Sequence, residues 1–315
     1  MNTHNKKDDL KTIFITGATS FIGTNLIKGL YNKNYNIVAI VRKNSTKLNL
    51  LSKYKKIKII ELDMEEIERL PDLVKMNCDV FYHLAWNGTR GLERDDKVIQ
   101  QNNYHYSINA LVAANKLCCK TFISAGSQAE YGIHDECITE ETIEKPVTEY
   151  GKYKLEFCNY AKSFCRENNI TFIEPRFFSL YGLGDNEKTL IISSIDKMLK
   201  NEDLNLTECI QTWNYLNIKD AVDALIKLQN VNTPGIYNFG SDDTRILKDF
   251  ISEIYGIINS KSNMNFGAVP YPESGIVSIN PCISKLKKAI NWEPKVKFSD
   301  GINEILEERK NYEKD

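Results

Sequence analysis

The chain has 315 residues, of which 42% are hydrophobic and 26% are charged, and its formal net charge is −1. This composition is typical of a globular protein with one large or two modest domains, and the balanced charge gives no reason to expect nucleic acid or an anionic membrane as a partner. No apolar run reaches the roughly 20 residues that a transmembrane helix needs.

The eight cysteines form no C-x-x-C pair and the four histidines are scattered, so we expect no metal site. The segment MNTHNKKDDL carries charges without an apolar stretch behind them, unlike a secretion signal. We therefore expect reduced thiols and a cytoplasmic location.

The first half of the chain alternates short apolar runs with helix-like segments. The apolar runs are TIFIT (12–16), NIVAIV (36–41), KIKII (56–60), DVFYHLA (79–85), TFISA (121–125) and TFIEPRF (171–177). Alternating strands and helices predict an α/β fold with a parallel sheet. The runs lack polar alternation, as expected for strands that are covered on both faces.

The regular alternation of strand-like and helix-like segments ends after residue 177. LNIKDAVDALIKLQN, LKDFISEIYGII and PCISKLKKAI are typical of helices, and GIYNFGS is typical of another strand. We expect a dinucleotide-binding domain over 1–177, with a returning segment at about 212–241. A smaller C-terminal α/β lobe would comprise 178–211 and 242–315.

ITGATSFIG (15–23) joins the first expected strand to the first expected helix. Glycine at such a turn lets a pyrophosphate approach the backbone N–H groups at the helix N-terminus. The candidate cofactor-binding residues in this turn are Gly17, Thr19, Ser20, Phe21, Ile22 and Gly23. The alternative is a tight strand–helix turn that binds no ligand.

The residues after the second strand report on the kind of cofactor. Arg42 and Lys43 stand where an NAD site usually has a carboxylate for the ribose 2′-hydroxyl, which favours NADP(H) over NAD(H). The alternative is that both are solvated loop charges. Asp63 and Met64 follow the third strand, where Asp63 could meet the adenine amine. Leu84 and Ala85 follow the fourth strand and are expected beside the cofactor.

TEYGKYKLEF (148–157) places Tyr150 and Lys154 four residues apart, on one face of a helix. The pair could be a proton donor beside a tuning cation or an ordinary solvated surface. The spacing alone leaves both interpretations open.

The motifs together resemble the extended short-chain dehydrogenase/reductases, a group of nucleotide-sugar epimerases, dehydratases and ketoreductases. The resemblance runs from TIFITGATSFIG through HLAW, SAGSQAEYG, YGKYK, PRFFSLYG and YLNIKDAVDALI to the tail SKLKKAINWEPKVKFSDGINEIL. It implies a Rossmann-type doubly wound sheet with a C-terminal substrate lobe. It also implies Ser127, Tyr150 and Lys154 as catalytic residues. Tyr150 and Lys154 would also bind the cofactor, Lys154 through its nicotinamide ribose.

The chemistry fits these residue types. A free tyrosine has a pKa near ~10, and an adjacent ammonium favours the phenolate and lowers that pKa. Tyr150 would then move the proton, Ser127 would hydrogen-bond the reacting oxygen, and a hydride would pass between nicotinamide and substrate.

The resemblance leaves three reactions to compare. Dehydratases of the family carry Asp-Glu directly after the Ser or Thr, whereas Ser127 is followed by Gln128 and Ala129, and Glu130 comes one place too late. We favour NADP(H)-dependent reduction of a keto group, at C4, on a nucleotide-linked sugar in deoxysugar or surface-polysaccharide biosynthesis. The alternatives are an NAD(P)-dependent nucleotide-sugar epimerase and a catalytically inactive cofactor-binding regulatory protein.

The substrate side departs from the family pattern. Trp213 replaces one arginine that often binds the nucleotide diphosphate, Pro272 replaces a second, and Ser179 replaces a frequent asparagine. Arg90 and Arg94 could replace the lost charge, and the alternative is that both are solvated loop charges. Trp213 could stack on a base or sugar, and the alternative is that it belongs to the core. The candidate substrate-binding residues are Trp86, Arg90, Ser127, Gln128, Ser179 and Trp213. The resemblance also implies a homodimer.

Overall fold

The computed structural model describes residues 10–271 and 275–312. The chain divides into two compact units: 1–126, 148–175 and 225–235 form the first, and 127–147, 176–224 and 236–315 form the second. This division places 127–147 in the second unit, whereas the sequence-based division placed this segment in the first domain. Pro272, one of the expected departures from the family pattern, lies outside the described residues.

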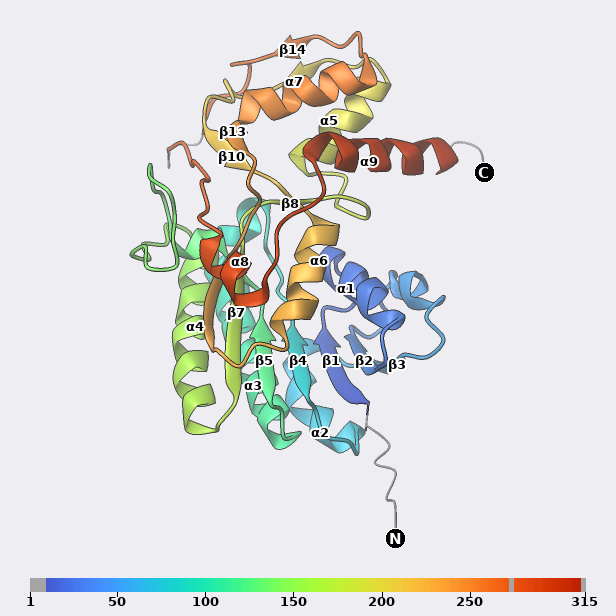
Figure 1. Ribbon diagram of the computed structural model, residues 1–315, viewed down its shortest axis with the longest axis vertical. Helices are drawn as coiled ribbons and strands as arrows, with labels where there is room; N and C mark the ends of the chain where they lie inside the picture. Colours follow the sequence, from blue (N-terminus) through green and yellow to red (C-terminus); the bar gives the residue numbers. More distant parts are fainter. Residues whose placement is uncertain (1–9, 272–274, 313–315) are drawn as a thin grey trace. The chain divides into compact units, whose positions relative to one another are not determined.

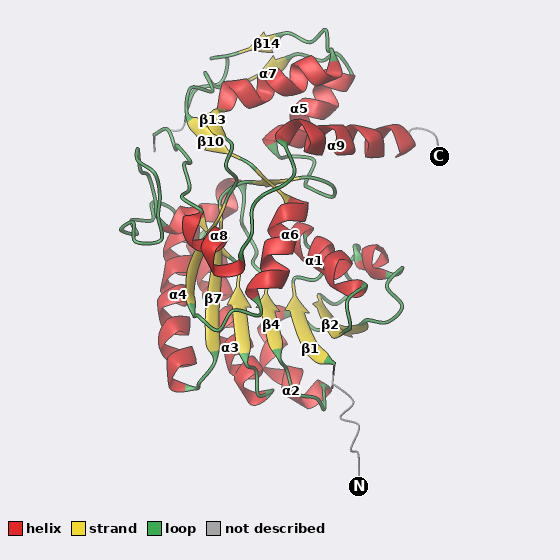
Figure 2. Cartoon of the chain, in the orientation of Figure 1, coloured by secondary structure: helices red, strands yellow, loops and turns green. Residues whose placement is uncertain are grey.

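Parallel strands form the centre of the first unit, in the order β7-β5-β4-β1-β2-β3. Their bounds are β1 Lys11–Thr16, β2 Tyr35–Val41, β3 Lys58–Glu61, β4 Val80–His83, β5 Thr121–Ser124 and β7 Thr171–Phe177, the last of which runs on into the second unit. Figure 2 shows the arrows of β1, β4 and β7 pointing the same way. All four residues of β4 are buried, which explains the lack of polar alternation in its sequence.

The connections of the first unit contain the helices α1 Phe21–Tyr31, α2 Leu70–Leu73, α3 Lys97–Lys116 and α4 Glu149–Glu167, and the 3-10 turns η1 Leu48–Leu51, η2 Met64–Arg69 and η3 Gly91–Asp95. Side-chain caps set where the long helices begin. Asp96 accepts from the N–H groups of Val98 and Ile99 at the start of α3, and Thr148 accepts from Gly151 N–H at the start of α4. These two long helices pack against each other (Figure 1).

The strand order reverses at β1, which pairs with β2 on one side and β4 on the other. Such a reversal leaves a crevice at the carboxyl ends of the strands, where open α/β sheets bind ligands. The predicted α/β fold with a Rossmann-type sheet is confirmed. The strands expected at 12–16, 36–41, 56–60, 79–85, 121–125 and 171–177 are all present, with bounds shifted by at most a few residues.

The second unit is built mainly from helices and very short strands. Its elements are β8 Leu180–Tyr181, α5 Leu190–Leu199, β9 Leu204–Asn205, β10 Thr212–Asn214, β11 Leu216–Asn217, β13 Thr244–Ile246, α7 Leu247–Ile258, β14 Met264–Asn265, α8 Ser284–Ile290 and α9 Phe298–Tyr312, with the 3-10 turn η4 Gln128–Glu130. The two-residue strand β6 Gly126–Ser127, the helix α6 Ile218–Leu228 and the strand β12 Gly235–Phe239 run across the division of the chain.

An apolar cluster holds the second unit together. Its centre is an aromatic group in which Phe250 of α7 lies 5.1 Å from the Tyr215 ring and 4.8 Å from the Phe298 ring, measured between ring centroids. Buried side chains of α5, α7 and α9 surround this group. Large buried aromatic side chains contribute most of the packing area per residue, so this cluster provides the second unit with its own core.

Candidate active site

Gly17 follows β1 and has a left-handed conformation, with φ +65°. A Cβ atom here would lie 2.8 Å from the backbone nitrogen of Ala85 and the carbonyl carbon of Leu84. At Gly23, a Cβ would lie 2.2 Å from the Gly17 carbonyl oxygen. Only glycine fits at both positions, so the turn brings bare backbone to the crevice between β1 and β4. Ser20 caps α1, where its hydroxyl oxygen accepts from Gly23 N–H at 3.1 Å.

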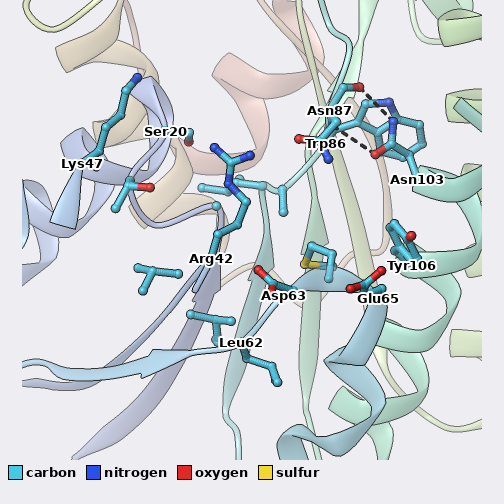
Figure 3. A pocket seen from close by; sticks show the side chains of 17 residues that line it. Ser20, Arg42, Lys47, Leu62, Asp63, Glu65, Trp86, Asn87, Asn103 and Tyr106 are labelled. Atoms are coloured by element: carbon cyan, nitrogen blue, oxygen red, sulfur yellow. Dashed lines mark hydrogen bonds between the residues drawn. The ribbon is translucent and has the colours of Figure 1, made fainter. Parts of the chain in front are cut away.

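A cavity of about 440 Å³ opens at this edge of the sheet (Figure 3). Its lining contains eight of the predicted cofactor residues, Gly17, Thr19, Ser20, Arg42, Asp63, Met64, Leu84 and Ala85, and the predicted substrate residue Trp86. Phe21, Ile22, Gly23, Lys43, Tyr150 and Lys154 are not part of this lining. A cavity of this size is in the range of small-molecule and cofactor sites.

Sequence reasoning missed several lining residues: Lys47, Glu65, Asn87, Asn103 and Tyr106. Asn87 and Asn103 exchange two hydrogen bonds, one from Asn87 N–H to the Asn103 side chain at 3.0 Å and one back to the Asn87 carbonyl at 2.8 Å (Figure 3). Asn87 lies in the loop after β4, and Asn103 lies on α3. No motif marked them, because their position depends on how α3 packs.

The two predicted cations after β2 behave differently. The Arg42 side chain lines the cavity. The Lys43 ammonium forms an ion pair with Glu66. The hydrogen bond between them raises the pKa of Lys43 and lowers the pKa of Glu66. Lys47, which sequence reasoning did not select, also lines the cavity.

Tyr150 and Lys154 are both buried on α4, with exposed fractions of 8% and 5%, so a solvated helix surface does not describe them. Lys154 Nζ donates to the Ala125 carbonyl at 2.6 Å and lies 3.7 Å from the centre of the Trp86 ring. The Trp86 ring in turn meets the Tyr150 ring edge to face, with 6.2 Å between centroids. Tyr153 is half-buried, and its ring lies 6.2 Å from the ring of Tyr104 on α3.

Arg94 of η3 lies over the Tyr150 ring, with 4.8 Å from the guanidinium carbon to the ring centre. The next residue, Asp95, accepts from Glu149 N–H at 3.1 Å and so ties η3 to the start of α4. Arg90, the arginine predicted to bind substrate, is exposed. Of the two arginines in this loop, Arg94 is therefore the one that the structure places at Tyr150.

His83 is buried behind the turn and forms a hydrogen-bond chain. Its Nδ1 lies 2.9 Å from Thr16 Oγ1, its Nε2 lies 2.9 Å from Ser107 Oγ, and Ser107 Oγ donates to the Asn103 carbonyl at 2.7 Å. A neutral ring that is protonated at Nε2 satisfies every partner. Burial, reinforced by the charge of Lys154, lowers the pKa of His83 to about 3.

Several predicted residues lie in the second unit. Ser127 caps η4: its hydroxyl oxygen accepts from Ala129 N–H at 3.2 Å, and its own N–H donates to Glu130 Oε1 at 2.7 Å. Gln128 and Ser179 are half-buried. Trp213, also half-buried, pairs with Arg245 across β10 and β13 and packs against two apolar clusters.

The glycine turn, the cavity beyond it and the buried tyrosine–lysine pair define a dinucleotide-dependent enzyme of the short-chain dehydrogenase/reductase class. Residues 13–240 match the NAD dependent epimerase/dehydratase family, and the chain belongs to this family. The extended short-chain dehydrogenase/reductase family predicted from the sequence is thereby confirmed. Among the described residues, no helix combines the length and apolar character needed to cross a membrane.

Two curated relatives match nearly the whole chain. CDP-abequose synthase of Salmonella muenchen is 25% identical over 310 residues, which cover 94% of this chain and 97% of the relative. ADP-L-glycero-D-manno-heptose-6-epimerase of Brachyspira hyodysenteriae is 25% identical over 319 residues, which cover 95% of this chain and 99% of the relative.

Solved structures show the same fold. UDP-glucose 4-epimerase of Thermotoga maritima, solved with UDP-glucose, has a TM-score of 0.87 at 20% identity and covers 96% of this chain and 99% of its own. UDP-glucuronic acid 4-epimerase of Bacillus cereus, solved with NAD, has a TM-score of 0.79 at 21% identity, with 94% and 99% covered.

Proposed function

We propose that the protein reduces a keto group, at C4, on a nucleotide-linked sugar with NADP(H), in deoxysugar or surface-polysaccharide biosynthesis. The observation that carries the proposal is that Tyr150 and Lys154 are both buried and both contact the ring of Trp86. Such deep burial is expected of a tyrosine that acts as a proton donor beside a cation, and not of a tyrosine on a solvated helix surface. The similarity to a CDP-abequose synthase supports a deoxysugar product.

The residues around the cavity fit a dinucleotide. Gly17, Thr19 and Ser20 line the cavity beside the start of α1, where backbone N–H groups would bind a pyrophosphate. Arg42 and Lys47 line the cavity, which supports a 2′-phosphate and hence NADP(H) over NAD(H). Asp63 and Met64 would meet the adenine. When bound, the cofactor supplies the hydride.

The roles of the chain's own residues follow from their chemistry. Under this proposal the Tyr150 hydroxyl gives its proton to the substrate oxygen as the carbonyl is reduced. Ser127 hydrogen-bonds the same oxygen. The Lys154 ammonium, which donates to the Ala125 carbonyl, would bind a ribose hydroxyl of the cofactor and favour the phenolate of Tyr150.

The dehydratase alternative lacks its acid. Gln128 and Ala129 follow Ser127, and the Glu130 carboxylate is buried in an ion pair with Arg176 at 3.0 Å. A carboxylate that is held this way is a poor proton donor to a substrate. The epimerase alternative has specific support, because one curated relative and the two solved structures described above are epimerases.

One experiment separates the candidates. The purified protein is incubated with a panel of keto-sugar nucleotides and NADPH that is deuterated at the transferred position. Reduction predicts one deuterium per product and an equal amount of NADP⁺, and Tyr150→Phe should slow the formation of both by about 10²–10⁴-fold. In a parallel incubation with hydroxyl-sugar nucleotides in place of the keto sugars, interconversion of the hydroxyl epimers without net cofactor consumption would favour the epimerase. Cofactor binding without turnover on any substrate would favour the inactive regulatory protein.

The assembly and location are part of the proposal. We propose a cytoplasmic homodimer that pairs through α3 and α4, as is common in the family. Light scattering of the purified protein tests the dimer, and a monomer at micromolar concentration would exclude it.

A further inference from the structure

A fully buried ion pair lies under the turn that carries Ser127. Glu130 Oε2 and Arg176 Nη2 are 3.0 Å apart, and both side chains have an exposed fraction of 0%. The same nitrogen donates to Glu144 Oε1 at 3.1 Å, and the guanidinium lies 4.4 Å from the centre of the Tyr131 ring. Apolar pairs often replace buried ion pairs without loss of stability, so stability alone does not account for this one.

The second oxygen of the Glu130 carboxylate shows what the pair holds in place. Glu130 Oε1 accepts from Ser127 N–H at 2.7 Å, while Ser127 Oγ accepts from Ala129 N–H at 3.2 Å. The two contacts form a reciprocal capping box around η4. Because a backbone N–H occupies one lone pair of Ser127 Oγ, the hydroxyl proton remains available to donate to another oxygen.

Further contacts hold the frame around this turn. Tyr131, next to Glu130, donates its hydroxyl to Asn238 Oδ1 at 2.7 Å. Asn238 N–H donates to Glu140 Oε1 at 2.9 Å. Hydrogen bonds between buried groups of this kind restrict the arrangement of the backbone. Glu130 is therefore fixed by Arg176 on one side and by a hydrogen-bonded frame on the other.

We propose that Glu130, held by Arg176, is a positioning residue for Ser127. One carboxylate oxygen faces Arg176 and the other accepts from Ser127 N–H, and the Ser127 hydroxyl is thereby presented as a donor to the reacting oxygen. Glu130 itself touches neither substrate nor cofactor. The inference rests on the proposed function, in which Ser127 binds the oxygen that is reduced.

The variants separate positioning from folding. Glu130→Val combined with Arg176→Met replaces the ion pair by apolar side chains of similar size and removes the contact to Ser127 N–H. Glu130→Gln keeps one acceptor oxygen, which can serve Ser127 or Arg176 but not both. Glu144→Gln is the matched control, because Glu144 also contacts Arg176 but does not contact Ser127 in the capping box. Ser127→Ala is made alone and together with the double replacement.

The first measurement needs no substrate. Hydrogen exchange of the Ser127 amide should be at least about 10-fold faster in the double replacement and unchanged in Glu144→Gln, since only the former loses its acceptor. Exchange of the Ser127 amide should be slowest in the wild type, faster in Glu130→Gln and fastest in the double replacement. Unchanged Ser127 exchange in the folded double replacement would overturn the inference. If that variant does not fold, Glu130→Gln alone decides in the same way.

The second measurement is turnover. The double replacement should lower kcat by about 10- to 100-fold with the cofactor Kd unchanged, and should lower it no further in the Ser127→Ala background. Equal losses in both backgrounds would show that Glu130 acts independently of Ser127, and the inference would be wrong. If the wild type turns over no keto-sugar nucleotide, the proposed function fails, and amide exchange still decides whether Glu130 positions Ser127.

Discussion

The ammonium of Lys154 lies 3.7 Å from the centre of the Trp86 ring while it donates to the Ala125 carbonyl at 2.6 Å. A lysine with an exposed fraction of 5% needs such compensation for its lost hydration. The position of the Lys154 ammonium therefore depends on a residue of the loop after β4. Trp86 also lines the cavity, so the same ring borders the expected cofactor site.

Trp86→Leu should lower the free energy of unfolding by about 1–3 kcal/mol, because it removes a cation–π contact and apolar contact area. It should also weaken cofactor binding, because Lys154 loses the ring that fixes it. Trp86→Phe keeps an aromatic face and loses only the indole hydrogen bond to Gln100, so its effects should be smaller. Urea unfolding and cofactor titration measure both. Equal effects of the two variants would contradict a role for the ring face.

Tyr150→Phe should lower turnover by about 10²–10⁴-fold, because it removes one positioned acid, and should leave cofactor binding nearly intact. Lys154→Ala should reduce both turnover and cofactor affinity. Tyr153→Phe is the control: this ring packs against Tyr104, on the α3 side of the helix, and should matter little. Turnover of the three folded variants on one accepted keto-sugar nucleotide decides. Near-normal turnover in Tyr150→Phe would remove Tyr150 as the acid.

Arg42→Ala should reduce the preference for NADPH over NADH by about 10- to 150-fold, the value of a charge-assisted contact to a 2′-phosphate. Lys47→Ala should act in the same direction, because Lys47 also lines the cavity. Lys43→Ala is the matched control, since Glu66 already holds that ammonium. Titration of all three variants with both cofactors measures the ratio. A wild type that binds NADH as tightly as NADPH would contradict the cofactor proposal.

The sheet was predictable because buried parallel strands have a strong local signal. β1 and β4 are apolar along nearly their whole length, and each is bounded by turn residues. β9, β11 and β14 gave no such signal, since two residues show no periodicity. The helix α5 was also not predicted. It packs against α7, and this contact joins segments that are far apart in sequence.

Prediction of the site from the sequence was limited in the same way, to residues that a local pattern marks. Gly17 and Arg42 were found because they occupy fixed places after strands, which sequence can locate. The pairing of Lys43 with Glu66 joins residues 23 apart, and no motif records it. Glu130 was set aside as lying one place too late for a dehydratase acid. Its burial against Arg176 became visible only with the fold, because Arg176 lies 46 residues further along the chain.

The buried histidine gives a pH dependence that can be derived from its contacts. In the neutral ring, Nε2–H faces Ser107 and Nδ1 accepts from Thr16, whose Oγ1 also faces the N–H of Leu84 at 3.2 Å. A proton added at Nδ1 would point at the Thr16 hydroxyl and remove the acceptor that this hydroxyl uses. This arrangement agrees with a pKa of about 3 for His83 in the folded protein, against the ordinary 6.5.

Between these two pKa values the unfolded chain binds one proton more than the folded chain. The contribution of neutral His83 to stability is therefore fully present above about pH 6.5 and is lost as the pH falls toward about 3, by up to about 1.4 kcal/mol per pH unit. Urea unfolding at several values between about pH 7.5 and about pH 5 should show this slope. His83→Gln should reduce it, whatever its effect at neutral pH. His105→Gln, at an exposed position on α3, should leave it unchanged. An identical slope in wild type and His83→Gln would show that His83 is not the group responsible.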